Sequence, residues 1–180
     1  PGHPRAALGP AVADPRGPAF PEPTSDPRLQ EDKGAVHVPS RFLQELENRV
    51  LYLDGAMGTA VHSLDLELEK DYLGKENCPE VLLKTRPEQI RGIHESFLEV
   101  GCDAVETNRF GSMAHVLQEF DLQDEAYEIS RLAAQTTREA CDKYETDDKP
   151  RFAVGTMGPG TKLITLGQID WDTMFESYRE

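Results

Sequence analysis

Short apolar runs that end in glycine or polar residues alternate with helical patterns along this chain, and this alternation restricts its fold more than any other feature. The runs span residues 50–53, 104–108 and 151–155. Apolar residues at helical spacing separate them, most clearly in 87–101 and 126–144. Strands joined through helices run parallel, because each crossover returns the chain to the same end of the sheet. We therefore expect an α/β fold with its polar loops at one edge of a parallel sheet.

The first apolar run, 50–53, carries no charge, which suits a strand buried on both faces. It stops at Asp54, and Gly55 and Gly58 follow, which allow backbone conformations closed to other residues and a close approach to a ligand. We expect a helix from about Thr59, so that N–H groups of the turn face an anion while Asp54 meets a cation. A small zwitterion such as an amino acid fits this turn. The alternative is a plain strand-to-helix connection that Asp54 caps.

Composition and charge exclude several classes of function. The net charge of −14 argues against binding to nucleic acid, which needs a basic face, and against an anionic membrane surface. No apolar run approaches the roughly 18 residues of a membrane span, and the beginning of the chain has no compact apolar signal core. We therefore expect a cytoplasmic protein.

Residues 1–39 differ from the rest of the chain. They hold nine of the 13 prolines and show neither helical nor strand periodicity, so we expect a disordered Pro-rich tail followed by one domain over 40–180. That domain has roughly 140 residues, whereas a complete eight-stranded barrel needs about 250. It is thus expected to be the N-terminal portion of a (β/α)8 TIM barrel or a small open sheet. A start at Pro1 and an end inside a helical pattern suggest a fragment of a longer protein.

The remaining segments have weaker patterns. We expect helices over 40–48, 60–68 and 112–120 and from about Asp172 onwards, with Ser40 and Thr85 as helix caps. The long connection 71–80 could cover the site at the end of the first strand. His94 is expected to be a packing or surface residue rather than a ligand. The glycines at 55 and 58 do not give the GxGxxG spacing of a dinucleotide site.

Three motifs on the expected strand ends resemble, in order and spacing, one known family. They are Leu53-Asp54-Gly55-Ala56-Met57-Gly58-Thr59, Glu106-Thr107-Asn108 with Phe110-Gly111, and Gly155-Thr156-Met157-Gly158-Pro159. Together they are similar to the N-terminal part of the homocysteine-binding domain, the homocysteine S-methyltransferase domain, of cobalamin-dependent methionine synthase. The match runs from about Asn48 to the end of the chain and includes helix 87–101.

The resemblance implies a (β/α)8 barrel that transfers a methyl group to the thiol of homocysteine and gives methionine, with zinc holding the sulfur as thiolate. It places the zinc ligands on three cysteines of later strands, beyond Glu180. Cys78, Cys102 and Cys141 lie far apart and do not match that pattern, so we expect ordinary buried or half-buried side chains, and neither metal ligands nor catalytic residues within this chain.

The methyl donor implied by the resemblance is methyltetrahydrofolate, acting through methylcobalamin on cobalamin-binding and folate-binding domains of the same or a partner chain. A sibling interpretation keeps homocysteine as acceptor and takes the methyl group from betaine or S-methylmethionine. The third interpretation is a non-catalytic module, a truncated half-barrel with open parallel edges. In every case we expect this chain alone to be inactive.

The substrate-binding residues implied by the resemblance belong to the glycine turn and to the end of the second strand: Asp54, Gly55, Ala56, Met57, Gly58, Thr59, Glu106 and Asn108. Backbone N–H groups of the turn would take the carboxylate of homocysteine, with Asp54 near its ammonium or near the metal site. Arg109 stands where the family usually has a small hydroxyl residue. It could point outward, or pair with Glu106 or with a substrate carboxylate.

Overall fold

The structure is a computed structural model of the 180-residue chain, and it describes residues 40–179. The predicted disordered tail, 1–39, lies outside these residues. The described part is an α/β unit that is mostly helical. Its elements in chain order are α1 (Arg41–Asn48), α2 (Met57–His62), η3 (Pro79–Val81), α3 (Leu82–Thr85), α4 (Pro87–Glu99), β1 (Ala104–Glu106), α5 (Ala114–Leu117), η4 (Gln118–Phe120), η5 (Gln123–Glu125), α6 (Ala126–Tyr144), β2 (Phe152–Val154), η6 (Ile164–Leu166) and α7 (Trp171–Arg179).

The two strands pair in parallel, as the alternation of runs and helices predicted. Ala104 of β1 lies opposite Phe152 of β2, and Leu53 forms an isolated parallel bridge with the same Ala104. On one side, the Ala104 N–H donates to the Tyr52 carbonyl, and the Ala104 carbonyl accepts from the Asp54 N–H. On the other side, β2 forms hydrogen bonds with the residues that flank β1. β1 therefore lies between segment 52–54 and β2, so that three parallel segments end at the same edge.

The expected first strand is the main correction. The structure has only the bridge at Leu53 in place of a strand over 50–53, and the expectation of burial on both faces is wrong. Leu51 is buried, but Val50 is 74% exposed and Tyr52 66%. A run without charge is buried on both faces only where other elements cover both, and within residues 40–179 this segment has a paired neighbour on its β1 side alone.

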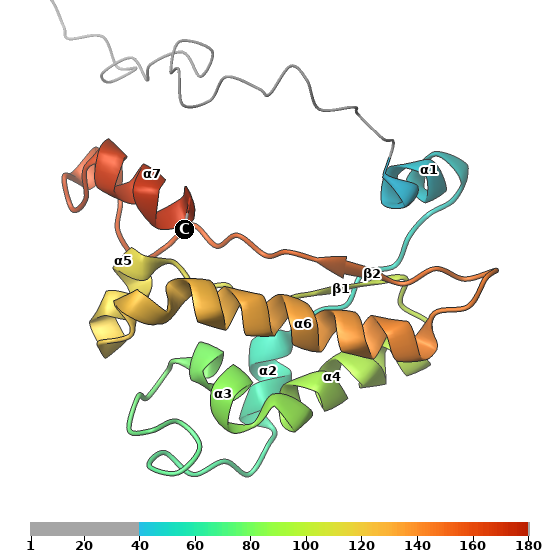
Figure 1. The fold of residues 1–180 in the computed structure, drawn as a ribbon, viewed down its shortest axis with the longest axis horizontal. Coiled ribbons are helices and arrows are strands. Elements are labelled where there is room, and N and C mark those ends of the chain that lie inside the picture. Colours follow the sequence, from blue (N-terminus) through green and yellow to red (C-terminus); the bar gives the residue numbers. More distant parts are fainter. Residues whose placement is uncertain (1–39, 180) are drawn as a thin grey trace, which may run out of the picture. The chain divides into compact units, whose positions relative to one another are not determined.

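Helices α4 and α6 make the main helical layer against the strands, and they run side by side in Figure 1. Their bounds agree with the periodic patterns in the sequence, and Gly101 follows α4 with a φ of +113°, which favours glycine. Ile90 and Leu98 of α4 and Ile129 of α6 are fully buried. Apolar faces at helical spacing therefore fold as predicted where two helices can bury each other.

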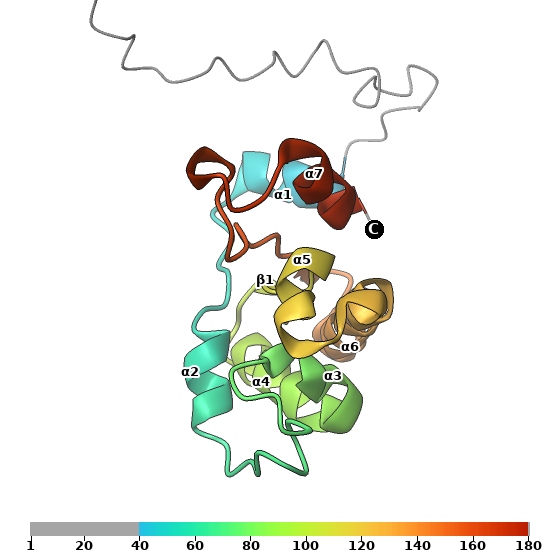
Figure 2. The same ribbon diagram turned by 90° about the vertical axis from the view of Figure 1, so that its left-hand side faces the viewer.

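The smaller helices differ from expectation at their ends. α2 begins at Met57, two residues before the expected start, and ends at His62 rather than near Leu68. In the loop that follows, buried Asp71 accepts a hydrogen bond from the Glu67 N–H (2.8 Å). The expected helix 112–120 is divided into α5 and η4. Figure 2 shows α2 beside α4, in agreement with their contacts.

Ser40 takes the predicted N-cap position of α1, whereas Thr85 does not take that of α4. The Ser40 side chain makes no capping hydrogen bond to α1, and the N-cap of α4 is Arg86. The Thr85 hydroxyl instead donates to the Asp71 carbonyl (2.6 Å), so its hydrogen bond stabilises the loop before α3 and not the start of α4. At the other end of the chain α7 packs beside α5, where the His115 N–H donates to Ser177 Oγ (3.0 Å). Within residues 40–179, no helix is long and apolar enough to cross a membrane.

Candidate functional site

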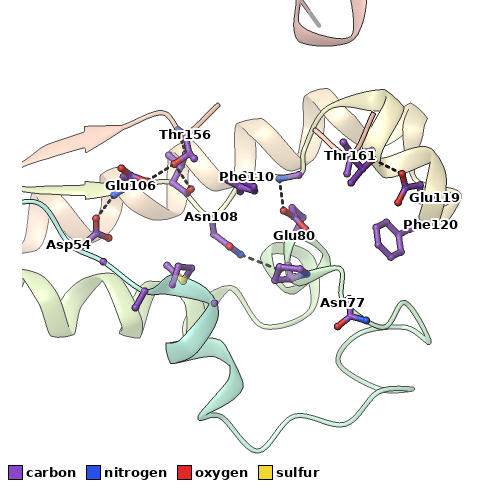
Figure 3. Close-up of a pocket in the computed structure, with 18 residues that line it drawn as sticks. Asp54, Asn77, Glu80, Glu106, Asn108, Phe110, Glu119, Phe120, Thr156 and Thr161 are labelled. Carbon is purple, nitrogen blue, oxygen red and sulfur yellow. Dashed lines mark hydrogen bonds between the residues drawn. The ribbon is translucent and has the colours of Figure 1, made fainter. Parts of the chain in front are cut away.

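The polar residues that end the three parallel segments meet at one edge of the sheet, as the sequence predicted. The Glu106 N–H donates to Asp54 Oδ1 (3.0 Å), which joins the first segment to β1. The Thr156 N–H donates to Thr107 Oγ1 (3.0 Å), and the Thr156 hydroxyl lies 3.3 Å from Glu106 Oε2, which joins β1 to the residues after β2. Figure 3 shows Asp54, Glu106 and Thr156 together at one end of a cavity.

The cavity has a volume of about 700 Å³. Its wall comes from the turn after the first segment, from the loop before α3, from the ends of the strands, and from α5 and η4. The lining residues are Asp54, Gly55, Ala56, Met57, Gly58, Asn77, Pro79, Glu80, Glu106, Thr107, Asn108, Phe110, Gly111, Val116, Glu119, Phe120, Thr156 and Thr161. All the sequence-predicted site residues are among them except Thr59, which is exposed on α2.

The turn reaches its shape by a route that the sequence did not indicate. Ala56 takes the left-handed conformation (φ +50°), whereas neither Gly55 nor Gly58 has a positive φ. A Cβ atom on either glycine would meet no other atom of residues 40–179 within 4 Å. The two glycines therefore leave space on the cavity wall that a larger side chain would fill. The first N–H groups of α2, which begins at Met57, have no partner inside the helix.

The lining carries negative charge. Asp54, Glu80, Glu106 and Glu119 contribute four carboxyl groups, and the residues found to line the cavity within 40–179 include no Lys, Arg or His. Burial raises the pKa of Asp54, and the neighbouring Glu106 charge adds to this, although the hydrogen bond from the Glu106 N–H opposes it. A cationic group in the cavity would relieve this repulsion, because an opposite charge within a few ångströms favours the ionised carboxylate.

The loop 71–80 supplies wall residues that sequence reasoning did not single out. Asn77, Pro79 and Glu80 line the cavity beside the end of β1, in keeping with the expectation that this loop could cover the site. The Asn108 side-chain amide donates to the Pro79 carbonyl (3.1 Å). The only signal in the sequence was the unusual length of this connection. Phe110, Val116, Glu119, Phe120 and Thr161 also line the cavity without having been predicted to bind.

Arg109 does not take the partner that one interpretation gave it. Its side chain is half-buried, and its Nε atom is buried without a hydrogen-bond acceptor in the part of the chain that the structure describes. Glu106 lies instead within hydrogen-bond distance of the Thr156 hydroxyl, and no ion pair joins Arg109 to Glu106 among residues 40–179. Arg109 is also not one of the cavity-lining residues.

The cysteines are packing residues, as predicted. Cys78 and Cys141 are buried and Cys102 is half-buried. Burial raises the pKa of the Cys78 and Cys141 thiols to about 11, in keeping with their positions inside the two apolar clusters of the core. No group of three or more His, Cys, Asp or Glu side chains within residues 40–179 is arranged to hold a metal ion. The described residues therefore do not fit a zinc site.

Fold and cavity together define a class of protein, an α/β domain with its candidate site at the carboxyl ends of parallel strands. Comparison with known proteins then gives the family. This chain belongs to the homocysteine S-methyltransferase family, whose model matches residues 51–180. It is homologous to the N-terminal part of methionine synthase, which confirms the resemblance inferred from the three motifs.

Two curated relatives are mycobacterial methionine synthases. The protein from Mycobacterium tuberculosis is 40% identical over 139 residues, and the one from Mycobacterium leprae is 39% identical over 139 residues. Each match covers 77% of this chain but only 12% and 11% of the respective relative. This chain thus spans about an eighth of the length of the relatives it matches.

Two crystal structures share the fold. They are the metallated and oxidized forms of the homocysteine methyltransferase MmuM from Escherichia coli, with TM-scores of 0.53 and 0.52. Both are 19% identical to this chain and cover 64% and 63% of it, against 40% and 39% of MmuM. At this identity the likeness concerns the fold alone.

Proposed function

We propose that this chain forms the N-terminal portion of a (β/α)8 barrel in a homocysteine S-methyltransferase, and that its cavity holds the amino-acid group of homocysteine. Three parallel segments ending at one edge, with α4 and α6 packed against the strands, support the barrel. The shared fold with MmuM agrees with it. The proposal also includes the predicted disordered tail over 1–39 and a domain that begins near Ser40.

The observation that carries the proposal is the pairing of a glycine turn with carboxylates in one cavity. The ammonium of homocysteine would lie near Asp54 and Glu106, whose mutual repulsion it relieves. Its carboxylate would accept hydrogen bonds from N–H groups of the turn 55–59, with Asn108 on the same wall. The apolar part of the substrate would contact Met57 or Phe110.

The reaction that we propose for the whole domain is methyl transfer from methyltetrahydrofolate, through methylcobalamin on other domains, to the thiol of homocysteine. The identity with two methionine synthases supports this donor over betaine or S-methylmethionine. Zinc would keep the sulfur ionised. Its ligands would be the cysteines that the resemblance implies beyond Glu180, because residues 40–179 do not fit a zinc site.

The second candidate is a non-catalytic module, and the exposed apolar side chains around the strands favour it for the 180-residue chain taken by itself. Val50, Tyr52 and Met157 are 66–74% exposed. An uncovered apolar surface next to parallel strands is the kind of surface that another segment or chain covers.

The test compares this chain with a longer protein that continues it along the sequence of the mycobacterial relatives. We expect the longer protein to bind zinc and homocysteine and to form methionine from methylcobalamin. The 180-residue chain should form none. Methionine formation by the 180-residue chain would contradict the proposal that the zinc ligands lie outside it. Failure of the longer protein to bind homocysteine would overturn the proposed function.

A further inference from the structure

The carboxyl group of Glu80 is buried where the loop before α3 meets the loop after β1. Glu80 lies in η3 (Pro79–Val81) and is 5% exposed, yet its carboxyl group borders the cavity. No ion pair reaches it within residues 40–179, and the one titratable group with which it interacts is the Cys78 thiol, 3.8 Å from Oε2. A buried carboxyl group without a cationic partner is costly, so it needs hydrogen bonds.

One of these hydrogen bonds fixes the loop after β1. The Gly111 N–H donates to Glu80 Oε1 at 2.7 Å, across a separation of 31 residues in the chain. The approach is so close that a Cβ atom on Gly111 would lie 2.9 Å from the same oxygen, closer than real Cβ contacts allow. The glycine and the glutamate are therefore matched to each other, and a side chain at 111 would push them apart.

A second bond holds the other end of this loop. The Asn108 amide donates to the Pro79 carbonyl (3.1 Å), so the adjacent residues 79 and 80 bind both ends of segment 108–111. That segment carries Asn108 and Phe110 on the cavity wall. In Figure 3, the Asn108 side chain points toward the loop that carries Glu80, and a dashed line joins the Glu80 carboxyl group to the loop after β1.

We propose that Glu80 is a positioning residue, which sets Asn108 and Phe110 against the substrate by holding the Gly111 N–H. The proposal rests on the proposed homocysteine site for its functional part. Glu80 contributes the acceptor, so an amide oxygen at the same distance can replace it, whereas a shorter or apolar side chain cannot. A role in charge alone would show the opposite pattern, because aspartate keeps the charge and glutamine does not.

The test uses amide hydrogen exchange of the 180-residue chain by NMR, with the variants Glu80→Gln, Glu80→Asp and Glu80→Leu. Loss of this buried hydrogen bond should speed exchange of the Gly111 amide about tenfold in Glu80→Asp and Glu80→Leu. Glu80→Gln should stay within about threefold of the unchanged chain. If Glu80→Leu does not fold, the comparison of Glu80→Asp with Glu80→Gln still decides the test.

The matched control is Glu119→Leu, which removes another carboxyl group from the same cavity. The Glu119 carboxylate accepts from the Thr161 hydroxyl (2.5 Å) instead of from Gly111, so exchange of the Gly111 amide should not change. Equal Gly111 exchange in Glu80→Asp and the unchanged chain would overturn the positioning role. The exchange measurement needs no ligand, so it gives its answer even if homocysteine binds elsewhere. If homocysteine does bind, its affinity should fall about tenfold in Glu80→Asp and recover in Glu80→Gln.

Discussion

His94 should make the stability of this fold fall steeply in mild acid. The side chain lies on the buried face of α4 and is 0% exposed. Its Nε2 atom is 3.2 Å from Thr137 Oγ1, and the Thr137 hydroxyl donates to the Ala133 carbonyl (2.8 Å). Since the hydroxyl hydrogen is used there, Nε2 carries the hydrogen of the neutral ring. Nδ1 is buried without a partner among residues 40–179, so a second proton would find no acceptor there.

The size of the effect follows from the pKa. Burial lowers the pKa of His94 from 6.5 to about 4. The unfolded chain therefore takes up the proton first, and the stabilisation is fully present above pH 6.5 and lost as the pH falls toward 4. One pKa unit is worth about 1.4 kcal/mol, so the free energy of unfolding should fall by about 3 kcal/mol across this window.

Urea unfolding at a series of pH values, followed by circular dichroism, measures this loss. His94→Gln keeps a donor toward Thr137 but does not titrate, so its free energy of unfolding should depend less on pH by about 3 kcal/mol. The same exchange at His62, which is exposed, is the control and should follow the unchanged chain. Parallel curves for the unchanged chain and His94→Gln would refute the reasoning.

The remaining predictions concern the site and its support. Gly158→Ala places a Cβ atom against the Phe110 carbonyl oxygen, closer than real Cβ contacts allow, so thermal unfolding should show a loss of about 1–3 kcal/mol in the free energy of unfolding. The new methyl group of Gly55→Ala meets no atom of the described residues within 4 Å, so the free energy of unfolding should stay within about 0.5 kcal/mol, while homocysteine affinity, measured by calorimetry, falls. Burial acts to raise the pKa of Asp103, but hydrogen bonds, chiefly from the Tyr52 N–H (2.9 Å), outweigh it and hold the pKa below 3.8. Asp103→Ala should thus cost about 1–3 kcal/mol at pH 7, and urea titrations should find the difference smaller below pH 3.8. Unchanged stability in Gly158→Ala, or a pH-independent loss in Asp103→Ala, would contradict these assignments.

The sequence predicted the long helices well because each carries its own evidence. The apolar faces of 87–99 and 126–144 repeat at helical spacing, and the two helices bury each other. The run 50–53 carries no such evidence. Whether its side chains are buried depends on which neighbours cover them, and those neighbours are distant in sequence.

The candidate site likewise contains residues that the sequence could predict and residues that it could not. The turn 54–58, Glu106 and Asn108 could be predicted because each follows an apolar run, and parallel strands bring such ends to one edge. Glu80 could not, because it reaches the cavity only when the loop 71–80 folds back on Gly111. The left-handed residue of the turn was also not predictable, since Ala56 takes a conformation that usually favours glycine.

The most direct test of the central claim is an NMR titration of the isotope-labelled 180-residue chain with three small molecules. L-homocysteine and L-methionine share the amino-acid group, whereas 1-propanethiol has only the thiol. Both amino acids should move the amide signals of 55–59 and 106–108, and the thiol should not. Signals that move elsewhere, or that respond equally to 1-propanethiol, would contradict the assignment of this cavity to the amino-acid group of homocysteine.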